Sequence, residues 1–269
     1  MSSHKKSDEP PELLTFTPKM MGAEDSGLFI GKRKSGKTTA LVDVMYHKRR
    51  VPDGLVFCGT ADSNGAFQKI VPDSYIYSDW DHQAILRSIE RMKKLNAKRQ
   101  AKGLPKKFSF LISDDNGWDA SFCNDKQLLR LLMNGRWWGF APMLVTLQFP
   151  LGFAPAYRNQ FDWVFLFREL LPSNRKRLYD HYAGQIGSYR RFCNTLDKYT
   201  SDFSCIVIRN SGNSNRIKDN FFVYKAKLRD WTVNPKQTRW HMGSKVYWKN
   251  HFNTYDPKWR ERDEDEADD

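Results

Sequence analysis

The residues GKRKSGKTT at positions 31–39 follow directly on the apolar run GLFI and lead into a helical pattern. They satisfy the pattern G-x-x-x-x-G-K-[ST] through Gly31, Gly36, Lys37 and Thr38. Glycines let successive backbone N–H groups approach phosphates closely, and the helix that follows directs the positive end of its dipole at the anion. A strand, a glycine-framed loop and a helix in this order predict a phosphate-binding loop.

The side chains of this loop differ in their expected roles. Lys37 is expected to reach the β- and γ-phosphates of ATP, and the hydroxyl of Thr38 is expected to bind Mg²⁺. The pattern does not require Lys32, Arg33 or Lys34, for which we predict no catalytic role. The predicted nucleotide-binding residues are those of the whole loop: Gly31, Lys32, Arg33, Lys34, Ser35, Gly36, Lys37, Thr38 and Thr39.

Two adjacent carboxylates follow the apolar strand pattern FSFLIS at 108–113. A phosphate-binding loop needs a metal-holding carboxylate on a neighbouring strand, and Asp114 is expected to hold Mg²⁺ through water. Asp115 is expected to polarise the attacking water as the general base. Two adjacent acids favour a hydrolase. The string DDNG also fits the D-x-x-G pattern of GTPases, but no N-K-x-D guanine-reading motif follows it.

A polar residue also ends the strand pattern LVTLQ at 144–148. Gln148 would read the γ-phosphate, or orient the attacking water, from the next strand over. Arg136, in LLMNGRWWGF, precedes that strand. A surface position is the ordinary interpretation of such a lone arginine.

Apolar runs alternate with helical patterns over most of the chain. Continuous apolar strands separated by helices favour an α/β fold with a central, mainly parallel sheet that helices cover on both faces. We predict strands at 27–31, 54–60, 108–113, 142–148 and 162–168 and in FSCIVIR and NFFVYKA, and helices at 38–50, 82–100, 125–138 and 173–184. We predict a flexible N-terminal tail at 1–15, one ATPase domain at 16–254 and an acidic C-terminal tail at 255–269.

Charge is unevenly distributed over a chain whose formal net charge is +13. The last seven residues, DEDEADD, hold six acids, so the rest of the chain carries about +19 by subtraction. Basic residues cluster in HKRR at 47–50, in the run 91–107 and toward the C-terminal part of the domain. Several clusters together favour a polyanionic partner, above all nucleic acid. A solvated surface is the alternative for any single cluster.

The remaining composition excludes several classes of protein. No apolar run approaches the roughly 20 residues of a membrane-spanning helix, so no membrane span is predicted. The N-terminus MSSHKKSDEPPE lacks the apolar region of a secretory signal, which predicts an intracellular protein. The four cysteines are scattered without a C-x-x-C, which indicates neither a zinc site nor a disulfide framework.

Set in order, the motifs resemble a known family. The strings GLFIGKRKSGKTT, GLVFCGTADSN, FLISDD, LLMNGRWWGF, LVTLQFPLGFAPAYRNQFDWVFLFRE, SNRKRLYDHYAG and SNRIKDNFFVYKA are similar to those of the genome-packaging ATPases of nucleocytoplasmic large DNA viruses. These are ATPases of the poxvirus, mimivirus and phycodnavirus type, within the FtsK/HerA superfamily of P-loop NTPases. The resemblance extends from about Gly27 to Ala226 and includes the strings between the nucleotide motifs.

This resemblance assigns roles to the candidate residues. It makes residues 31–38 the Walker A loop, Asp114 and Asp115 the Walker B pair, Gln148 the sensor glutamine and Arg136 the arginine finger. The implied fold is that of an FtsK/HerA-like P-loop NTPase.

The finger is expected to act between subunits. Arg136 lies just ahead of the strand that ends in Gln148, which places it away from its own Lys37 and within reach of the γ-phosphate that the next subunit holds. Arg168, at the end of WVFLFR, is the rival candidate, and a structural arginine is the other alternative. Trp137 stands where family members commonly carry a histidine.

The resemblance implies an ATPase that drives double-stranded viral DNA into preformed capsids as a homo-oligomeric ring, with ATP and Mg²⁺ as cofactors. Such a motor grips phosphates without reading bases. Capsid portal or vertex proteins are further implied partners, and the implied location is the viral factory in the host-cell cytoplasm, with retention in the virion. The alternatives are a DNA helicase or other nucleic-acid-dependent NTPase, a nucleotide kinase, and a structural DNA-binding protein that binds nucleotide without hydrolysing it.

Overall fold

The computed structural model describes residues 8–60, 65–118, 120–149 and 153–254. Within these ranges nine strands form one sheet in the order β1-β9-β8-β7-β2-β6-β5-β3-β4. They are β1 (Leu14–Thr15), β2 (Gly27–Ile30), β3 (Gly54–Cys58), β4 (Ile76–Tyr77), β5 (Ser109–Asp114), β6 (Phe140–Leu147), β7 (Trp163–Leu166), β8 (Cys205–Arg209) and β9 (Phe221–Tyr224). Neighbouring strands are parallel except where β8 meets β7 and β9. The predicted central, mainly parallel sheet is confirmed.

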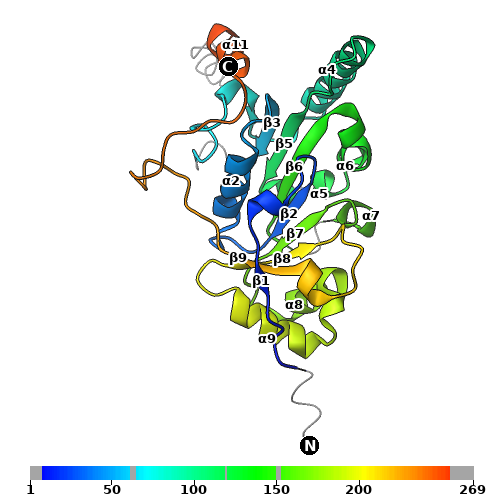
Figure 1. The fold of residues 1–269 in the computed structure, drawn as a ribbon, viewed down its shortest axis with the longest axis vertical. Helices are drawn as coiled ribbons and strands as arrows, with labels where there is room; N and C mark the ends of the chain where they lie inside the picture. The colour runs from blue at the N-terminus through cyan, green and yellow to red at the C-terminus, as the bar shows by residue number, and fades with distance from the viewer. Residues whose placement is uncertain (1–7, 61–64, 119, 150–152, 255–269) are drawn as a thin grey trace, which may run out of the picture.

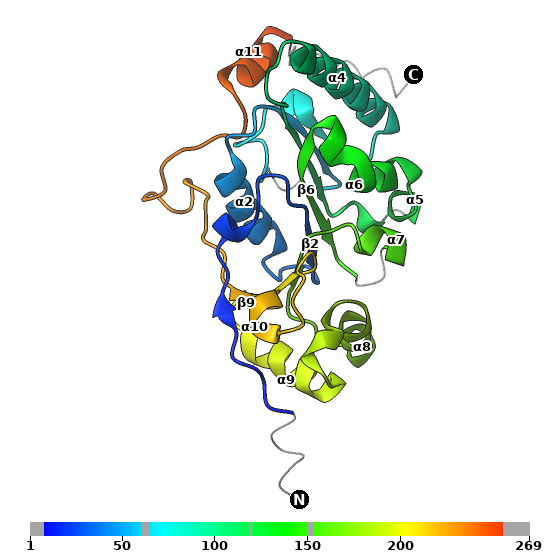
Figure 2. The same ribbon diagram turned by 45° about the vertical axis from the view of Figure 1, so that its right-hand side comes forward.

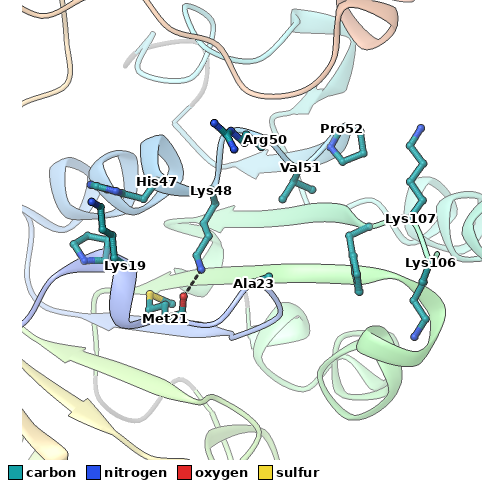
Figure 3. Close-up of a pocket in the computed structure, with 12 residues that line it drawn as sticks. Lys19, Met21, Ala23, His47, Lys48, Arg50, Val51, Pro52, Lys106 and Lys107 are labelled. Carbon is teal, nitrogen blue, oxygen red and sulfur yellow. Dashed lines mark hydrogen bonds between the residues drawn. The ribbon is translucent and has the colours of Figure 1, made fainter.

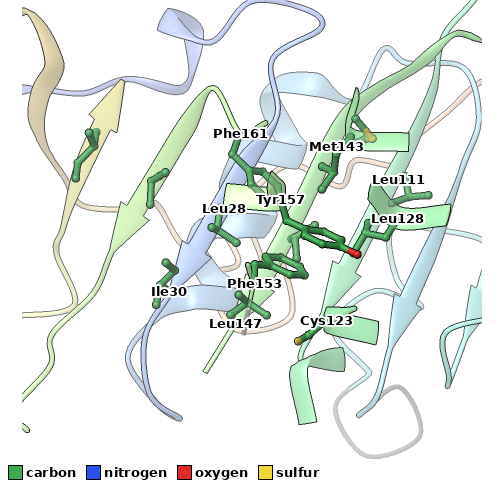
Figure 4. Close-up of a cluster of buried hydrophobic side chains, with 14 of the residues drawn as sticks. Leu28, Ile30, Leu111, Cys123, Leu128, Met143, Leu147, Phe153, Tyr157 and Phe161 are labelled. Carbon is green, nitrogen blue, oxygen red and sulfur yellow. The ribbon is translucent and has the colours of Figure 1, made fainter. Parts of the chain in front are cut away.

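The strand that leads into the predicted phosphate-binding loop lies in the interior of this sheet. β2 pairs with β6 on one side and with β7 on the other. Successive side chains of a strand point to opposite faces, so Leu28 and Ile30 enter one hydrophobic cluster and Phe29 enters the other. Figure 4 shows Leu28 and Ile30 in the first cluster, beside Leu147 of β6 and Phe153. Because both faces of β2 are buried, all four of its residues are apolar or glycine.

Helices cover both faces of the sheet (Figures 1 and 2). They are α2 (Lys37–Lys48), α4 (His82–Ala101), α5 (Ala120–Cys123), α6 (Lys126–Trp138), α7 (Pro155–Arg158), α8 (Pro172–Leu178), α9 (Tyr189–Tyr199), α10 (Ile217–Asn220) and α11 (Lys245–Thr254). The face that holds Leu28 packs against α4, α6, α8 and α9. The face that holds Phe29 packs against α2 and α11. The α/β prediction with helices on both faces is therefore confirmed.

Residues 8–15 pack against the domain, although we predicted a flexible tail up to residue 15. β1 pairs with β9, Leu13 is buried, and its backbone N–H donates to the hydroxyl of Tyr199 at 3.3 Å. A two-residue strand has too little hydrophobic periodicity to be recognised in a sequence. Residues 1–7 and 255–269, which make up the rest of the predicted tails, lie outside the described residues.

The helices also differ from the prediction, which did not include α5, α7, α9, α10 or α11. The helix predicted at 173–184 begins at Pro172 and ends at Leu178, where a wider helical turn follows. Proline is pre-organised for the first turn of a helix, so the helix begins there and not after a serine cap. α9 was not predicted, although Ser188 caps it by accepting the N–H of Arg191 at 3.0 Å.

Candidate active site

The predicted phosphate-binding loop connects the carboxyl end of β2 to α2. Steric constraints explain why glycine occupies two of its positions. A Cβ on Gly31 would lie 2.6 Å from the Cβ of Phe167 and 2.8 Å from Ser35 Oγ. Gly36 has a φ of 95°, in the left-handed region that glycine adopts without strain. Lys34 also has a positive φ, of 59°. The backbone thus turns tightly around the space in front of α2.

Lys37 is the first residue of α2, and its side chain is buried. Its Nζ donates to the carbonyl oxygen of Lys32 at 3.2 Å and lies 3.7 Å from Asp115 Oδ1. Burial lowers the pKa of Lys37, while the charges of Asp115 and Asp114 oppose that shift. The loop therefore holds a positive group where low dielectric strengthens its attraction for an anion.

Asp114 is the last residue of β5 and is fully buried. Its carboxylate accepts a hydrogen bond from Thr38 Oγ1 at 3.3 Å and one from Thr146 Oγ1 at 2.7 Å. Burial raises the pKa of Asp114 to about 6, and the neighbouring charge of Asp115 adds to the shift. A carboxylate and a hydroxyl in contact are the hard oxygen ligands that Mg²⁺ prefers.

Thr146, inside β6, holds both carboxylates and was not singled out in the sequence. Its hydroxyl donates to Asp114 and accepts the backbone N–H of Asp115 at 2.9 Å. Asp115 has a φ of 57°, so the chain bends sharply at this position as it leaves β5. The available signal was one polar residue inside the otherwise apolar run LVTL. Thr146 is therefore a positioning residue for the two acids.

The loop surrounds a cavity of about 450 Å³ whose lining includes Ser35, Lys37, Thr38 and Asp115. Ser35 Oγ is buried and has no hydrogen-bond partner in the described part of the chain. An unpaired buried hydroxyl costs free energy, and a phosphate oxygen would satisfy it. A nucleoside triphosphate with Mg²⁺ fits this set of groups: the Ser35 hydroxyl, the Lys37 ammonium and the Thr38–Asp114 pair.

Gln148 lies at the same edge of the sheet as these groups. It follows directly on β6, which pairs with both β2 and β5. The strands are parallel, so their carboxyl ends meet there, and the Gln148 side chain is half-buried. Its role in reading the γ-phosphate stays a prediction.

Arg136 lies at the opposite edge of the sheet from Lys37. It forms an ion pair with Asp162, which precedes β7 and also accepts the N–H of Ser26 at 2.8 Å. Arg168 follows β7 at the same edge of the sheet as Lys37, and its guanidinium lies 3.5 Å from a carboxylate oxygen of Asp197. The structure thus does not bring Arg136 to the loop of its own subunit. Action of either arginine on a neighbouring subunit stays a prediction.

A basic groove of about 540 Å³ lies at that opposite edge (Figure 3). Its basic lining residues are Lys19, His47, Lys48, Arg50, Lys106 and Lys107. Lys48 Nζ donates to the carbonyl oxygen of Met21 at 2.7 Å, which fixes its side chain across the groove. Basic residues of the HKRR cluster and of the end of the 91–107 run therefore lie on one surface.

Comparison with solved structures shows the fold. The structure of the genome-packaging NTPase B204 from Sulfolobus turreted icosahedral virus 2, in complex with AMPPCP, matches 77% of this chain and 100% of its own, with a TM-score of 0.53 and 14% identity. The conjugation coupling protein TcpA of pCW3, solved with ATPγS, matches 84% of this chain and 73% of its own, with a TM-score of 0.51 and 10% identity. The chain therefore shares the fold of these two proteins.

Two viral proteins are more similar to this chain in sequence than these solved structures are. Uncharacterized protein 088R of Invertebrate iridescent virus 3 is 36% identical over 205 residues, which cover 76% of each chain. Uncharacterized protein L437 of Acanthamoeba polyphaga mimivirus is 31% identical over 242 residues, which cover 88% of this chain and 84% of the relative. The chain belongs to the same family as these iridovirus and mimivirus proteins. No protein-family model matches it. Across the described ranges, no helix combines the length and apolar character that a bilayer crossing requires.

Proposed function

We propose that the protein is an ATP-driven motor that moves double-stranded viral DNA into preformed capsids as a ring of identical subunits. One observation carries the proposal. Lys37, Thr38, Asp115 and the unpaired hydroxyl of Ser35 line one cavity, and the buried carboxylate of Asp114 accepts the hydroxyl of Thr38 beside it. Membership of a family of large DNA virus proteins supports it, and so does the fold shared with a packaging NTPase of another virus.

The proposed reaction is the in-line attack of water on the γ-phosphorus of ATP. A bond forms to the water oxygen, and the bond to the leaving ADP oxygen breaks. Asp115 orients the water and accepts its proton. Lys37 offsets charge on the phosphoryl oxygens, and Thr146 holds both carboxylates in place. Mg²⁺, bound by Thr38 and Asp114, would add neutralising positive charge at the phosphates.

The basic groove is the proposed contact for DNA. Its cations come from three segments of the chain, and it lies at the edge of the sheet away from the loop, so one subunit binds nucleotide and polyanion at separate places. Phosphate contacts carry no base information, which suits a motor that moves any sequence. We further propose that capsid portal or vertex proteins are partners of the motor. The proposed location is the viral factory in the host-cell cytoplasm, with retention in the virion.

Phosphate release by the purified protein, with and without linear duplex DNA, tests this function. We expect Mg²⁺-dependent ATP turnover that DNA stimulates, and we expect no turnover by Lys37→Ala. A nucleotide kinase would transfer phosphate to a nucleotide acceptor, and a purely structural DNA-binding protein would release none. A helicase would separate the strands of the duplex. Turnover by Lys37→Ala at the wild-type rate would refute the assignment of the loop.

Charge substitutions test the groove itself. Arg50→Ala, Lys106→Ala and Lys107→Ala together should make the dependence of DNA affinity on salt shallower. The magnitude of the slope of log K for DNA binding against log salt concentration should fall by about 0.9 for each DNA phosphate that the variant no longer neutralises. The matched control is the triple variant Arg177→Ala, Arg190→Ala and Lys198→Ala, which removes the same number of positive charges from α8 and α9, outside the groove. Equal slopes for the two triple variants would show that the groove is a solvated basic surface and not the DNA contact.

A further inference from the structure

A second cavity, of about 200 Å³, adjoins the loop cavity along α2. The two cavities share Thr38 and Thr39, in the first turn of that helix. With volumes of about 200 and 450 Å³, they together fall within the roughly 300–1,000 Å³ of small-molecule sites. A nucleotide whose terminal phosphates occupy the loop would therefore extend past these two threonines into the second cavity.

The second cavity has largely apolar walls. They come from Val42 of α2, from Ala66 and Ile70 in the segment after β3, and from Leu228 and Trp231 in the segment after β9. Ile70 is 3% exposed, whereas Leu228 is 45% exposed, and Trp231 is half-buried. An exposed leucine and a tryptophan beside a polar phosphate-binding loop suit a ligand that has a flat apolar part next to its anionic part.

One buried carboxylate attaches the segment after β9 to α2. Asp43, which is 1% exposed, accepts hydrogen bonds from Tyr224 Oη at 2.6 Å, from the backbone N–H of Lys227 at 2.8 Å and from Arg229 Nε at 2.6 Å. The Arg229 guanidinium also lies 3.9 Å from the ring centroid of Tyr46. These contacts fix the apolar wall beside the loop, so the cavity is formed before a ligand arrives.

We infer that the second cavity binds the base of the nucleotide, with the ring against Leu228 and Trp231 and the ribose beside Thr39. The inference rests on the proposed binding of ATP at the loop. On the rim, Lys69 Nζ pairs with Asp230 at 3.1 Å and donates to Thr232 Oγ1 at 2.9 Å. Since these polar groups are engaged with one another, contact with the ring face is the main source of recognition. The ligand class is therefore a nucleoside triphosphate with an aromatic base.

Binding of Mg·ATP and of Mg·tripolyphosphate to the full-length protein tests the inference. Tripolyphosphate has the phosphate chain but no base. Stacking of a base on an aromatic side chain accounts for about a 5- to 150-fold change in affinity, so Trp231→Ala should raise the Kd for ATP by that factor. The Kd for tripolyphosphate should stay at the wild-type value. Trp231→Phe, which keeps an aromatic ring, should recover most of the affinity for ATP.

Two further variants keep the test decisive. Trp137→Ala removes a tryptophan that is 77% exposed at the opposite edge of the sheet, and it should leave both affinities unchanged. Leu228→Ala truncates an exposed wall residue and should weaken ATP alone, which covers the case of a misfolded Trp231→Ala. If both wall variants bind ATP as the wild type does, while Lys37→Ala loses both ligands, the base lies elsewhere and the proposed function stands. If the wild type binds neither ligand, the proposed function and this inference both fail.

Discussion

Asp114→Asn should stabilise the metal-free protein and abolish its metal-dependent reaction. Burial raises the pKa of Asp114 from an ordinary value of 3.8 to about 6. The folded protein thus binds this proton more tightly than the unfolded chain, so ionisation of Asp114 lowers the free energy of unfolding progressively as pH rises from about 4 to about 6. About two pKa units at 1.36 kcal/mol each make the loss about 3 kcal/mol above pH 6.

The local geometry suits this substitution. An asparagine amide keeps an oxygen to accept the bond from Thr146 Oγ1, and its nitrogen can donate to Thr38 Oγ1. The change therefore removes a buried charge beside Asp115 without leaving either hydroxyl unpaired. It also removes the anionic oxygen that Mg²⁺ requires.

Urea unfolding in EDTA measures the effect. We expect a gain of up to about 3 kcal/mol at pH 8 and of about 1 kcal/mol at pH 4.5. Asp180→Asn, which disrupts an exposed pair with Lys176, is the control and should change stability by less than about 1 kcal/mol. Equal stability of wild type and Asp114→Asn at pH 8, or a gain that does not vary with pH, would contradict a raised pKa of Asp114 in the folded protein.

Three other substitutions separate the proposed roles. Asp115→Asn should keep Mg·ATP bound and slow single-turnover hydrolysis by about 10²–10⁴; lost binding with unchanged chemistry would reverse the roles of the two acids. Arg136→Ala should keep ATP binding and lose hydrolysis, and mixing it with Lys37→Ala subunits should restore partial turnover. Full activity of Arg136→Ala alone would eliminate it as the finger, and Arg168→Ala is then tested by the same mixing. Asp43→Ala should lower the free energy of unfolding by about 3–5 kcal/mol, because it removes the buried carboxylate that pairs with the half-buried guanidinium of Arg229; an unchanged urea midpoint would contradict the anchoring role.

The loop and the two carboxylates were predictable from sequence for a physical reason. Each follows a continuous apolar strand, and the carboxyl ends of parallel strands meet at one edge of a sheet. Gly31, Gly36, Asp114 and Asp115 therefore needed only local patterns and the assumption of a parallel sheet to be placed together. The mainly parallel order of the strands confirms that assumption.

The supporting groups were not predictable, because their partners are distant in sequence. Thr146 matters only because β6 pairs with β5, which no local pattern encodes. Asp43 binds Tyr224 and Arg229, which lie 181 and 186 residues away. Likewise, the ion pair of Arg136 with Asp162 joins α6 to the residue that precedes β7, 26 positions later in the chain. Such contacts emerge only when the whole sheet is assembled.

Displacement of a third strand from linear duplex DNA measures translocation most directly. We expect the wild-type protein with Mg·ATP to release a triplex-forming strand bound along the duplex, while the two strands of the duplex stay annealed. Lys37→Ala should release none. ATP turnover with the third strand left in place, or release that Lys37→Ala performs equally well, would contradict the proposal that this protein is an ATP-driven motor on double-stranded DNA.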